Sequence, residues 1–243
     1  MSIGIDIGSK IIKIVELEKE AKGFNLLASG AVGYQGILPQ NAKDDKELVA
    51  LSDVVRKLHK EAHVRGKEVT IALPESLVFT RTIKFPPLSD QEVASAVKWE
   101  AEQYVPIPIA EAIIEHQIIE RSQGVNAGVT VLLVACPRTL VETYIKLIAG
   151  AGLTVVGAET EVLALCRSLA PETGTFLLLD FGAQSTDIAI TKNGMVNFSR
   201  SIPTAGDAFT RVISQNLGIE NQQAEAYKKT YGLSSSLEGK VKG

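Results

Sequence analysis

The sequence predicts a mixed α/β protein made of two related halves, and the main evidence is an internal repeat. Ile3–Val15 (IGIDIGSKIIKIV) and Leu177–Ile190 (LLLDFGAQSTDIAI) both read apolar–Asp–apolar–Gly, then a short polar turn, then a second apolar-rich run. At a shift of 174 residues, Asp6 matches Asp180 and Gly8 matches Gly182. Each copy predicts two antiparallel strands joined by a tight turn. Strand and helix patterns alternate between the copies, which favours the α/β class.

The composition of the chain limits the classes of protein to which it can belong. With 243 residues, 45% of them apolar, the chain can bury one large core or two smaller ones. The net charge of −3 and the absence of a basic block give nucleic-acid binding no electrostatic support. Cys136 and Cys166 lie in apolar stretches, as reduced cytosolic thiols usually do. There is no signal-peptide pattern, and the longest apolar run, Val129–Cys136, is too short for a bilayer span, so we expect a cytoplasmic protein.

The first half is expected to begin in the order β-β-β-α-β. After the first hairpin, Phe24–Val32 predicts a third strand. Glu47–Ala62 predicts a helix, because five apolar residues recur at helical spacing. These residues are Leu48, Leu51, Val55, Leu58 and Ala62. Val69–Leu73 then predicts a buried strand that ends at Pro74.

Residues 76–136 predict an inserted β-α-β-β unit. Ser89 and Glu92 form a capping box that opens its helix. The helix must end near Val105, because Pro106 and Pro108 interrupt its hydrogen bonds. The strands of the unit are expected at Leu77–Phe85, Ile113–Arg121 and Val129–Cys136, with a turn at Gln123–Gly128 between the last two.

The remaining elements complete the first half and begin the second. A helix opened by Pro137 and ended by Gly150 and Gly152, a strand at Leu153–Ala158 and a helix at Glu161–Leu169 finish the first half. The second half is expected to contain a hairpin at Phe176–Thr191, a strand at Met195–Ile202, and helices at Ala208–Asn216 and Asn221–Tyr231. Compared with the first half, it lacks its last two strands, so we expect it to be incomplete at the C-terminus.

The repeated turns predict a site for a polyphosphate. A glycine turn exposes backbone N–H groups that suit an anion. A carboxylate immediately before the turn would repel phosphate unless a hydrated Mg²⁺ lay between them. One Asp-x-Gly turn alone would be an ordinary hairpin, but two copies half a fold apart favour a clamp around a phosphate chain. No Walker loop occurs in the sequence.

These paired motifs resemble the two phosphate motifs of the actin-like ATPase superfamily, whose fold is ribonuclease H-like. Within it, Asp90–Ile119 (DQEVASAVKWEAEQYVPIPIAEAIIEHQII) is similar to the signature of the PilM family of type IV pilus assembly proteins. The segments CPRTLVETYIKLIAGAGL and ETEVLALCRSL resemble that family too, so the likeness covers nearly the whole chain. It implies subdomain 1A at residues 1–75 and 137–172, 1C at 76–136, the start of 2A at 173–217 and part of 2B at 218–243.

The resemblance implies ATP and Mg²⁺ between the halves. The first phosphate motif falls on Asp6, Gly8, Ser9 and Lys10, and the second on Asp180, Gly182, Ala183, Gln184, Ser185 and Thr186. Asp6 and Asp180 would hold Mg²⁺ through water. Lys10 either reaches a phosphate or is a solvated turn lysine.

Further contacts are expected from the helices of the second half. The segment Thr204–Asp207 opens a helix, so free N–H groups of Gly206 and Asp207 would favour a phosphate or ribose oxygen, although Ala205 replaces a glycine that relatives often carry. In the resemblance, Glu225 and Lys228 hold the ribose and the adenine edge. Alternatively they form an ordinary surface pair one helical turn apart.

The resemblance leaves catalysis open and implies at most a slow ATPase. A polar residue at the end of the first half would orient the attacking water. Glu159 is the candidate and Glu161 the alternative, and either could instead cap a helix. The three histidines, His59, His63 and His116, form no metal or triad pattern.

The implied function is a cytoplasmic scaffold at the inner face of the inner membrane, attached through its partner within the pilus assembly machinery. The partner would be the N-terminal peptide of a PilN-like membrane protein, bound near Leu77–Phe85 and Ser89–Tyr104, with Trp99 as a reporter. The alternatives are an FtsA-like cell-division protein and, less favoured, a sugar kinase of the same superfamily. An unfinished second sheet also predicts self-association and weak nucleotide binding.

Overall fold

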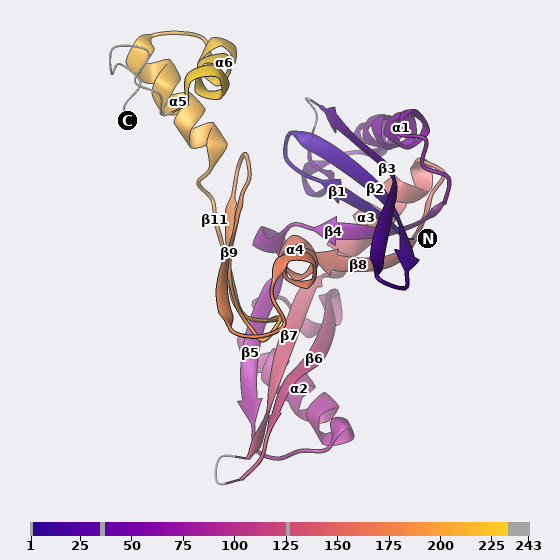
Figure 1. Ribbon diagram of the computed structural model, residues 1–243, viewed down its shortest axis with the longest axis vertical. Helices are drawn as coiled ribbons and strands as arrows, with labels where there is room; N and C mark the ends of the chain where they lie inside the picture. The colour runs from indigo at the N-terminus through magenta and orange to yellow at the C-terminus, as the bar shows by residue number, and fades with distance from the viewer. Residues whose placement is uncertain (1, 35–36, 125–126, 233–243) are drawn as a thin grey trace.

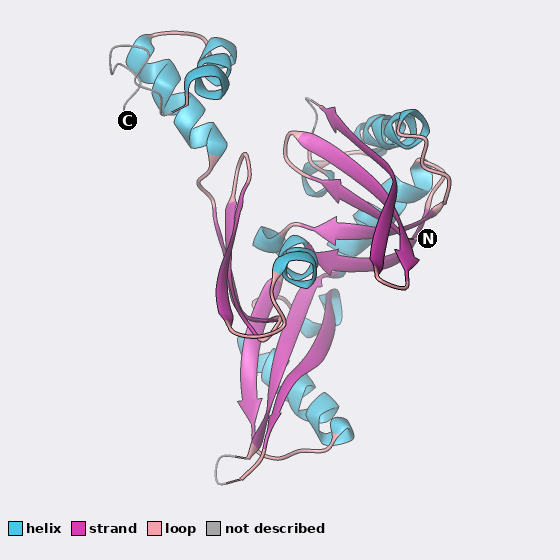
Figure 2. Ribbon diagram, in the orientation of Figure 1, coloured by secondary structure: helices cyan, strands magenta, loops and turns pink. Residues whose placement is uncertain are grey.

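The computed structural model describes residues 2–34, 37–124 and 127–232, arranged as three separate sheets with helices packed against them (Figures 1 and 2). The first sheet has the order β3-β2-β1-β4-β8, in which β1 pairs antiparallel with β2 and parallel with β4. Its elements are β1 (Ser2–Ile7), β2 (Ile11–Glu20), β3 (Gly23–Gly33), α1 (Asp45–Glu61), β4 (Glu68–Leu73), α3 (Arg138–Gly150), β8 (Thr154–Thr160) and α4 (Glu161–Leu169). The predicted elements of this half are therefore all present.

The largest core lies between the first sheet and two of its helices. Ile3, Ile5 and Ile7 alternate along β1 and are buried, as the period of two along a strand requires. Helices α1 and α3 cover this face of the sheet, and Val55 and Tyr144 are among their buried side chains. One face of the first sheet is thus closed by helices.

The insert forms its own sheet with the order β5-β7-β6 and one covering helix. Its elements are β5 (Phe79–Phe85), α2 (Asp90–Tyr104), β6 (Ala112–Ser122) and β7 (Gly128–Pro137). The capping box of Ser89 and Glu92 is present as predicted. Helix α2 packs its buried residues Val93, Val97 and Ala101 against β7. The predicted first strand is shortened, because Glu75–Leu77 forms the 3₁₀ turn η2 and Phe79 begins β5. Two further 3₁₀ turns were not predicted, η1 (Pro39–Asn41) and η3 (Ile109–Glu111).

The second half has three strands in the order β11-β10-β9 among the described residues, where the first sheet has five. Its elements are β9 (Thr175–Phe181), β10 (Thr186–Lys192), β11 (Met195–Ile202), α5 (Gly206–Leu217) and α6 (Asn221–Tyr231). Asn193 and Gly194 both have positive φ, as the predicted hairpin turn requires. A small core of α4, β7 and this sheet joins the second half to the rest.

Two of the predicted segments extend beyond the described residues. They are the turn at Gln123–Gly128, which includes residues 125–126, and the segment 218–243, which includes residues 233–243. Within the described ranges, no helix is long and apolar enough to cross a membrane. The boundaries of the four predicted subdomains stay predictions.

Candidate functional site

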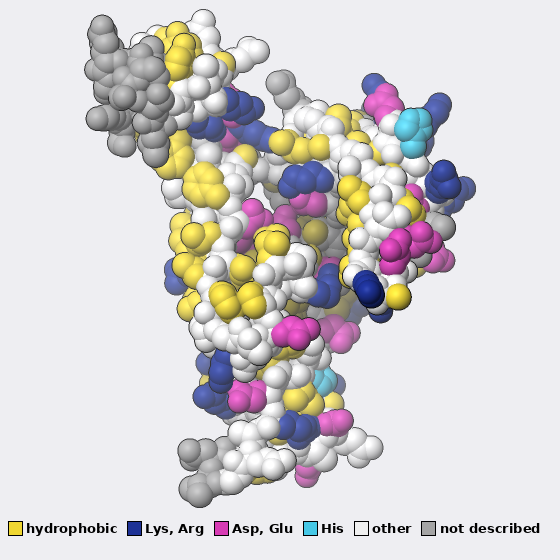
Figure 3. All heavy atoms as spheres, viewed as in Figure 1, with side chains coloured by type: hydrophobic (Ala, Val, Ile, Leu, Met, Phe, Trp, Pro, Cys, Tyr) yellow, Lys and Arg dark blue, Asp and Glu magenta, His cyan; other side chains and the backbone are white. Residues whose placement is uncertain are grey.

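A cleft of about 1840 Å³ lies between the first half and the second half. It is lined by the β1–β2 turn, the β9–β10 turn, the start of α5 and one side of α6. Figure 1 shows α5 and α6 facing the first sheet across this space, and Figure 3 shows the hollow, with charged side chains along it. The cleft brings together nine predicted site residues: Ser9, Lys10, Gly182, Ala183, Gln184, Gly206, Asp207, Glu225 and Lys228. The other five predicted binding residues, Asp6, Gly8, Asp180, Ser185 and Thr186, are not among its lining residues.

The two Asp-x-Gly turns have the same hydrogen-bonded geometry. The Gly8 amide donates to the Ile11 carbonyl at 3.1 Å, and the Gly182 amide donates to the Ser185 carbonyl at 3.0 Å. A Cβ at Gly8 would lie 3.1 Å from the Ile11 oxygen, and one at Gly182 would lie 3.0 Å from the Ser185 oxygen. Glycine suits both turns, because a Cβ there would force the neighbouring carbonyl to shift by a few tenths of an ångström.

Asp6 is paired with Lys13, which sequence reasoning missed. The two residues lie directly opposite in the β1–β2 ladder, and Lys13 Nζ lies 2.9 Å from Asp6 Oδ2. This hydrogen bond raises the pKa of Lys13 against the opposing effect of burial. The hairpin register was the signal that could have revealed Lys13. The other carboxylate oxygen of Asp6 is buried and meets no hydrogen-bond partner among the described residues.

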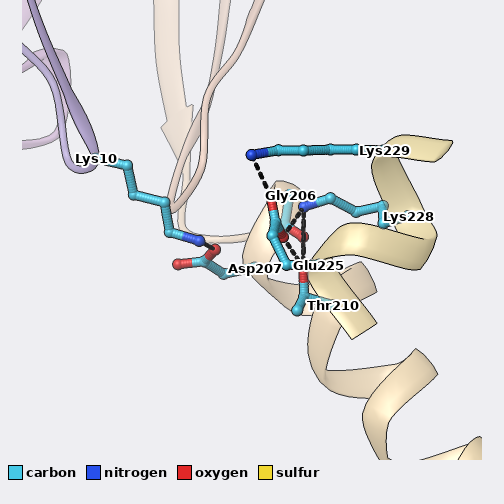
Figure 4. Close-up of polar contacts among 7 residues, drawn as sticks. All are labelled: Lys10, Gly206, Asp207, Thr210, Glu225, Lys228 and Lys229. Atoms are coloured by element: carbon cyan, nitrogen blue, oxygen red, sulfur yellow. Dashed lines mark hydrogen bonds and ion pairs between the residues drawn. The ribbon is translucent and has the colours of Figure 1, made fainter. Parts of the chain in front are cut away.

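Lys10 and Asp207 form an ion pair across the cleft (Figure 4). Lys10 belongs to the β1–β2 turn and Asp207 to the first turn of α5, so the pair joins the two halves. Its side chains are 44% and 34% exposed, respectively. In the structure, a carboxylate on the opposite side of the cleft neutralises the Lys10 ammonium group. Neither of the two sequence-based alternatives for Lys10 included this ion pair.

Glu225 and Lys228 belong to a half-buried network rather than to an exposed surface pair. Lys228 Nζ lies 2.6 Å from Glu225 Oε2 and also donates to the Gly206 carbonyl and the Thr210 hydroxyl, each at 2.9 Å (Figure 4). Thr210 in turn donates to Glu225. Burial alone would raise the pKa of Glu225, but Lys228, Thr210 and Lys10 together lower it to about 2. A fixed carboxylate and a fixed ammonium therefore line the α6 side of the cleft.

The first amides of α5 are not free, so that part of the prediction is wrong. The Gly206 amide donates to the Gly182 carbonyl at 3.2 Å, and the Asp207 amide donates to the Ala183 carbonyl at 2.8 Å. These bonds tie the start of α5 to the β9–β10 turn. The β9–β10 turn and the start of α5 therefore form one hydrogen-bonded unit on the second-half side of the cleft.

Several carboxylates lie behind the two turns. Burial, with the charges of Asp6, Asp187 and Asp180, raises the pKa of Glu161 to about 8. Burial also raises the pKa of Asp187, which lies opposite Asp180 in the ladder. Glu159, by contrast, is held by the guanidinium of Arg167 through both carboxylate oxygens. Of the two candidates for orienting water, Glu161 is the one that lies in the field of the aspartates of both turns.

Comparisons with known proteins give the family and the fold of this chain. The family described as "Type IV pilus assembly protein PilM" matches residues 4–242. A solved "PilM-PilN type IV pilus biogenesis complex" contains a chain that is 26% identical, with a TM-score of 0.81, covering 99% of this chain and 72% of that one. MreB 5 of Spiroplasma citri bound to AMPPNP is 16% identical with a TM-score of 0.52, covering 95% of this chain and 62% of that one.

A curated relative is the cell division protein FtsA of Streptococcus pneumoniae serotype 2, which is 25% identical over 253 residues. The match includes 94% of this chain, and the chain spans 55% of the length of that relative. Together these findings confirm the predicted actin-like fold class.

Proposed function

Because the chain belongs to the PilM family of type IV pilus assembly proteins, we propose that it is a nucleotide-dependent scaffold of pilus assembly. ATP and Mg²⁺ bind in the cleft between the halves. The N-terminal cytoplasmic peptide of a PilN-like inner-membrane protein binds between the insert and the first half, which attaches the scaffold to the inner face of that membrane.

One observation carries the nucleotide proposal. Two turns with identical hydrogen bonding, from different halves, border one large cleft, and each follows an aspartate. Exposed backbone at such turns, together with Lys10 and Lys13, suits the phosphates. In this proposal Lys228 and Glu225, both hydrogen-bonded to Thr210, would contact the base and the ribose.

The residues present fit a magnesium ion. Mg²⁺ prefers oxygen ligands and usually keeps several waters, so Asp6 and Asp180 would hold it through water. The buried Asp6 oxygen without a hydrogen-bond partner among the described residues is consistent with this role. When bound, the ion supplies positive charge that offsets the phosphates and the surrounding carboxylates.

For hydrolysis we propose Glu161, rather than Glu159, as the residue that orients water. Arg167 occupies both oxygens of Glu159. A carboxyl whose pKa is about 8 is mostly protonated at neutral pH and then cannot accept a proton from water.

The nucleotide proposal is tested by calorimetry with Mg-ATP on the parent chain, Asp6→Ala and Asp180→Ala. We expect each variant to bind at least about tenfold more weakly, a loss of about 1.4 kcal/mol. The control is Asp53→Asn, which removes an exposed carboxylate on α1 that pairs with Arg56. Equal affinity in all four proteins would contradict the clamp.

The peptide proposal is supported by the similarity to a chain of a solved PilM–PilN complex. Trp99, the single tryptophan, is 69% exposed on α2 of the insert, so its fluorescence can report an apolar peptide that covers it. We expect a blue shift on adding a synthetic N-terminal peptide of a PilN-like protein, and crosslinks to β5 or α2. Crosslinks confined to residues after Thr175 would rule this location out.

The FtsA relatives keep a cell-division role as the second candidate. Family membership favours pilus assembly instead. Capture of a PilN-like peptide would favour pilus assembly, and its failure would favour the cell-division role.

A further inference from the structure

Glu75 is a buried carboxylate at the point where the first half, the insert and the second half meet. It lies in η2, the 3₁₀ turn that connects β4 of the first sheet to β5 of the insert. The residue is only 5% exposed, and glutamates are rarely buried to this degree unless they are paired.

Its main partner comes from the second half. The Ser199 hydroxyl on β11 donates to Glu75 Oε1, whereas Oε2 has no hydrogen-bond partner among the described residues. Burial raises the pKa of Glu75, Asp187 adds to this effect, and the hydroxyls of Ser199, Thr160 and Thr80 oppose it. Burying a carboxylate with one oxygen unpaired is costly, so stability alone does not account for Glu75.

The strand ladder connects Ser199 to the second phosphate turn. Ser199 lies opposite Ala189 on β10, and two residues farther along Ser201 lies opposite Asp187. Asp187 lies opposite Asp180 on β9, which leads into Gly182. Hydrogen-bonded pairing therefore runs without interruption from the Ser199 strand through β10 to the strand that enters this turn.

The same strand touches the insert elsewhere. Strands β5 and β11 lie side by side (Figure 1), and the Thr82 hydroxyl donates to the Asn197 carbonyl at 2.6 Å. This contact is exposed, and it lies on the side of Ser199 away from Ser201 and Asp187. The Thr82–Asn197 contact therefore provides a matched control for the Glu75–Ser199 contact, because both involve β11.

We infer that Glu75 is a positioning residue: through Ser199 it sets the place of β10, β11 and the second phosphate turn relative to the insert. The nucleotide affinity then depends on the position of the insert relative to β10 and β11. The insert is also where the partner peptide is proposed to bind. This last step rests on the proposed function, whereas the positioning itself does not.

Hydrogen exchange of the whole chain without nucleotide tests the positioning. In Glu75→Ala and Ser199→Ala, we expect the amides of Gly206 and Asp207 to exchange several-fold faster, because their hydrogen bonds hold the β9–β10 turn against α5. Glu75→Gln keeps an acceptor for Ser199 and should exchange like the parent. Thr82→Val should also leave these amides unchanged. Equal exchange in Glu75→Ala and the parent would overturn the inference, as would an equal increase in Thr82→Val.

Mg-ATP binding by the same variants tests the functional step. We expect Glu75→Ala and Ser199→Ala each to weaken binding about fivefold, and the double variant to be no weaker than either, because both remove one contact. Additive losses in the double variant would overturn the inference. If the parent itself binds no Mg-ATP, the proposed function fails, while the exchange experiment still decides the role of Glu75.

Discussion

At the scale of single residues, charged side chains in and beside the cleft neutralise one another, once across the two halves and twice within one half. Lys10 meets Asp207, Lys13 meets Asp6, and Lys228 meets Glu225. Each ammonium group therefore already has a carboxylate that a phosphate would have to replace. This competition gives the first prediction.

Asp207→Asn should strengthen the binding of inorganic pyrophosphate, because it frees Lys10 for the anion. Partly exposed ion pairs contribute about 0.2–1 kcal/mol, so we expect a gain of roughly 1.4- to fivefold. Lys10→Ala should weaken binding instead. Calorimetry at low ionic strength measures both, and weaker binding by Asp207→Asn would show that its carboxylate serves the ligand directly.

The raised pKa of Glu161 should make the stability of the protein depend on pH. Its pKa is raised from 4.5 to about 8 in the folded protein, so the folded state binds more protons than the unfolded state between these values. Stability should therefore fall as the pH rises from about 5 to about 8, by at most about 1.4 kcal/mol per pH unit for one proton. Urea unfolding with EDTA at several pH values measures this slope.

Glu161→Gln should reduce that slope. Burial also raises the pKa of Glu75 and Asp187, so a part of the dependence should remain in the variant. An unchanged slope in Glu161→Gln would show that Glu161 is ionised in the folded protein.

At the scale of elements, α4 depends on its N-cap. The buried Thr160 hydroxyl accepts from the Leu163 amide at 3.2 Å, and the helix that begins there carries Glu161. Thr160→Ala should lower the free energy of unfolding by about 1 kcal/mol, whereas Thr160→Ser should keep most of the stability. Denaturant unfolding of the two variants decides this. Equal stability of Thr160→Ala and the parent would mean that this cap does not hold α4.

At the scale of the whole molecule, the second sheet exposes an apolar face. Leu177 and Leu179 on β9 are 60% and 62% exposed, and the ladder places Ile190 beside Leu177 and Phe198 beside Ile190. Figure 3 shows hydrophobic side chains gathered along this part of the surface. A contiguous apolar patch favours contact with another surface, so self-association stays a prediction.

Replacing both Leu177 and Leu179 with lysine should shift sedimentation toward the monomer at high protein concentration. Val49→Lys is the control, because Val49 is also exposed but lies on α1, away from this sheet. If the parent is already monomeric at every concentration, or if both substitutions act equally, the apolar face does not drive association.

Local sequence patterns were sufficient to predict most elements and both Asp-x-Gly turns. The capping box at Ser89, the Asn193-Gly194 turn and the proline stop after α2 depend on neighbouring residues only. The contacts Asp6–Lys13 and Glu75–Ser199 were not predicted, because they depend on ladder register and on how separate sheets pack. The same holds for the α5 amides, which the β9–β10 turn occupies.

The internal repeat separates most clearly what the sequence by itself determined from what the tertiary structure decided. The repeat makes Ile3, Ile5 and Ile7 equivalent to Leu177, Leu179 and Phe181, and in both places the alternation specifies a strand with one apolar face. In the first half α1 and α3 cover that face, and the three isoleucines are buried. In the second half the equivalent residues are exposed, because burial depends on which elements pack over a strand. The sequence determined the strand and its turn, and only the packing around each copy decided whether its apolar face became core.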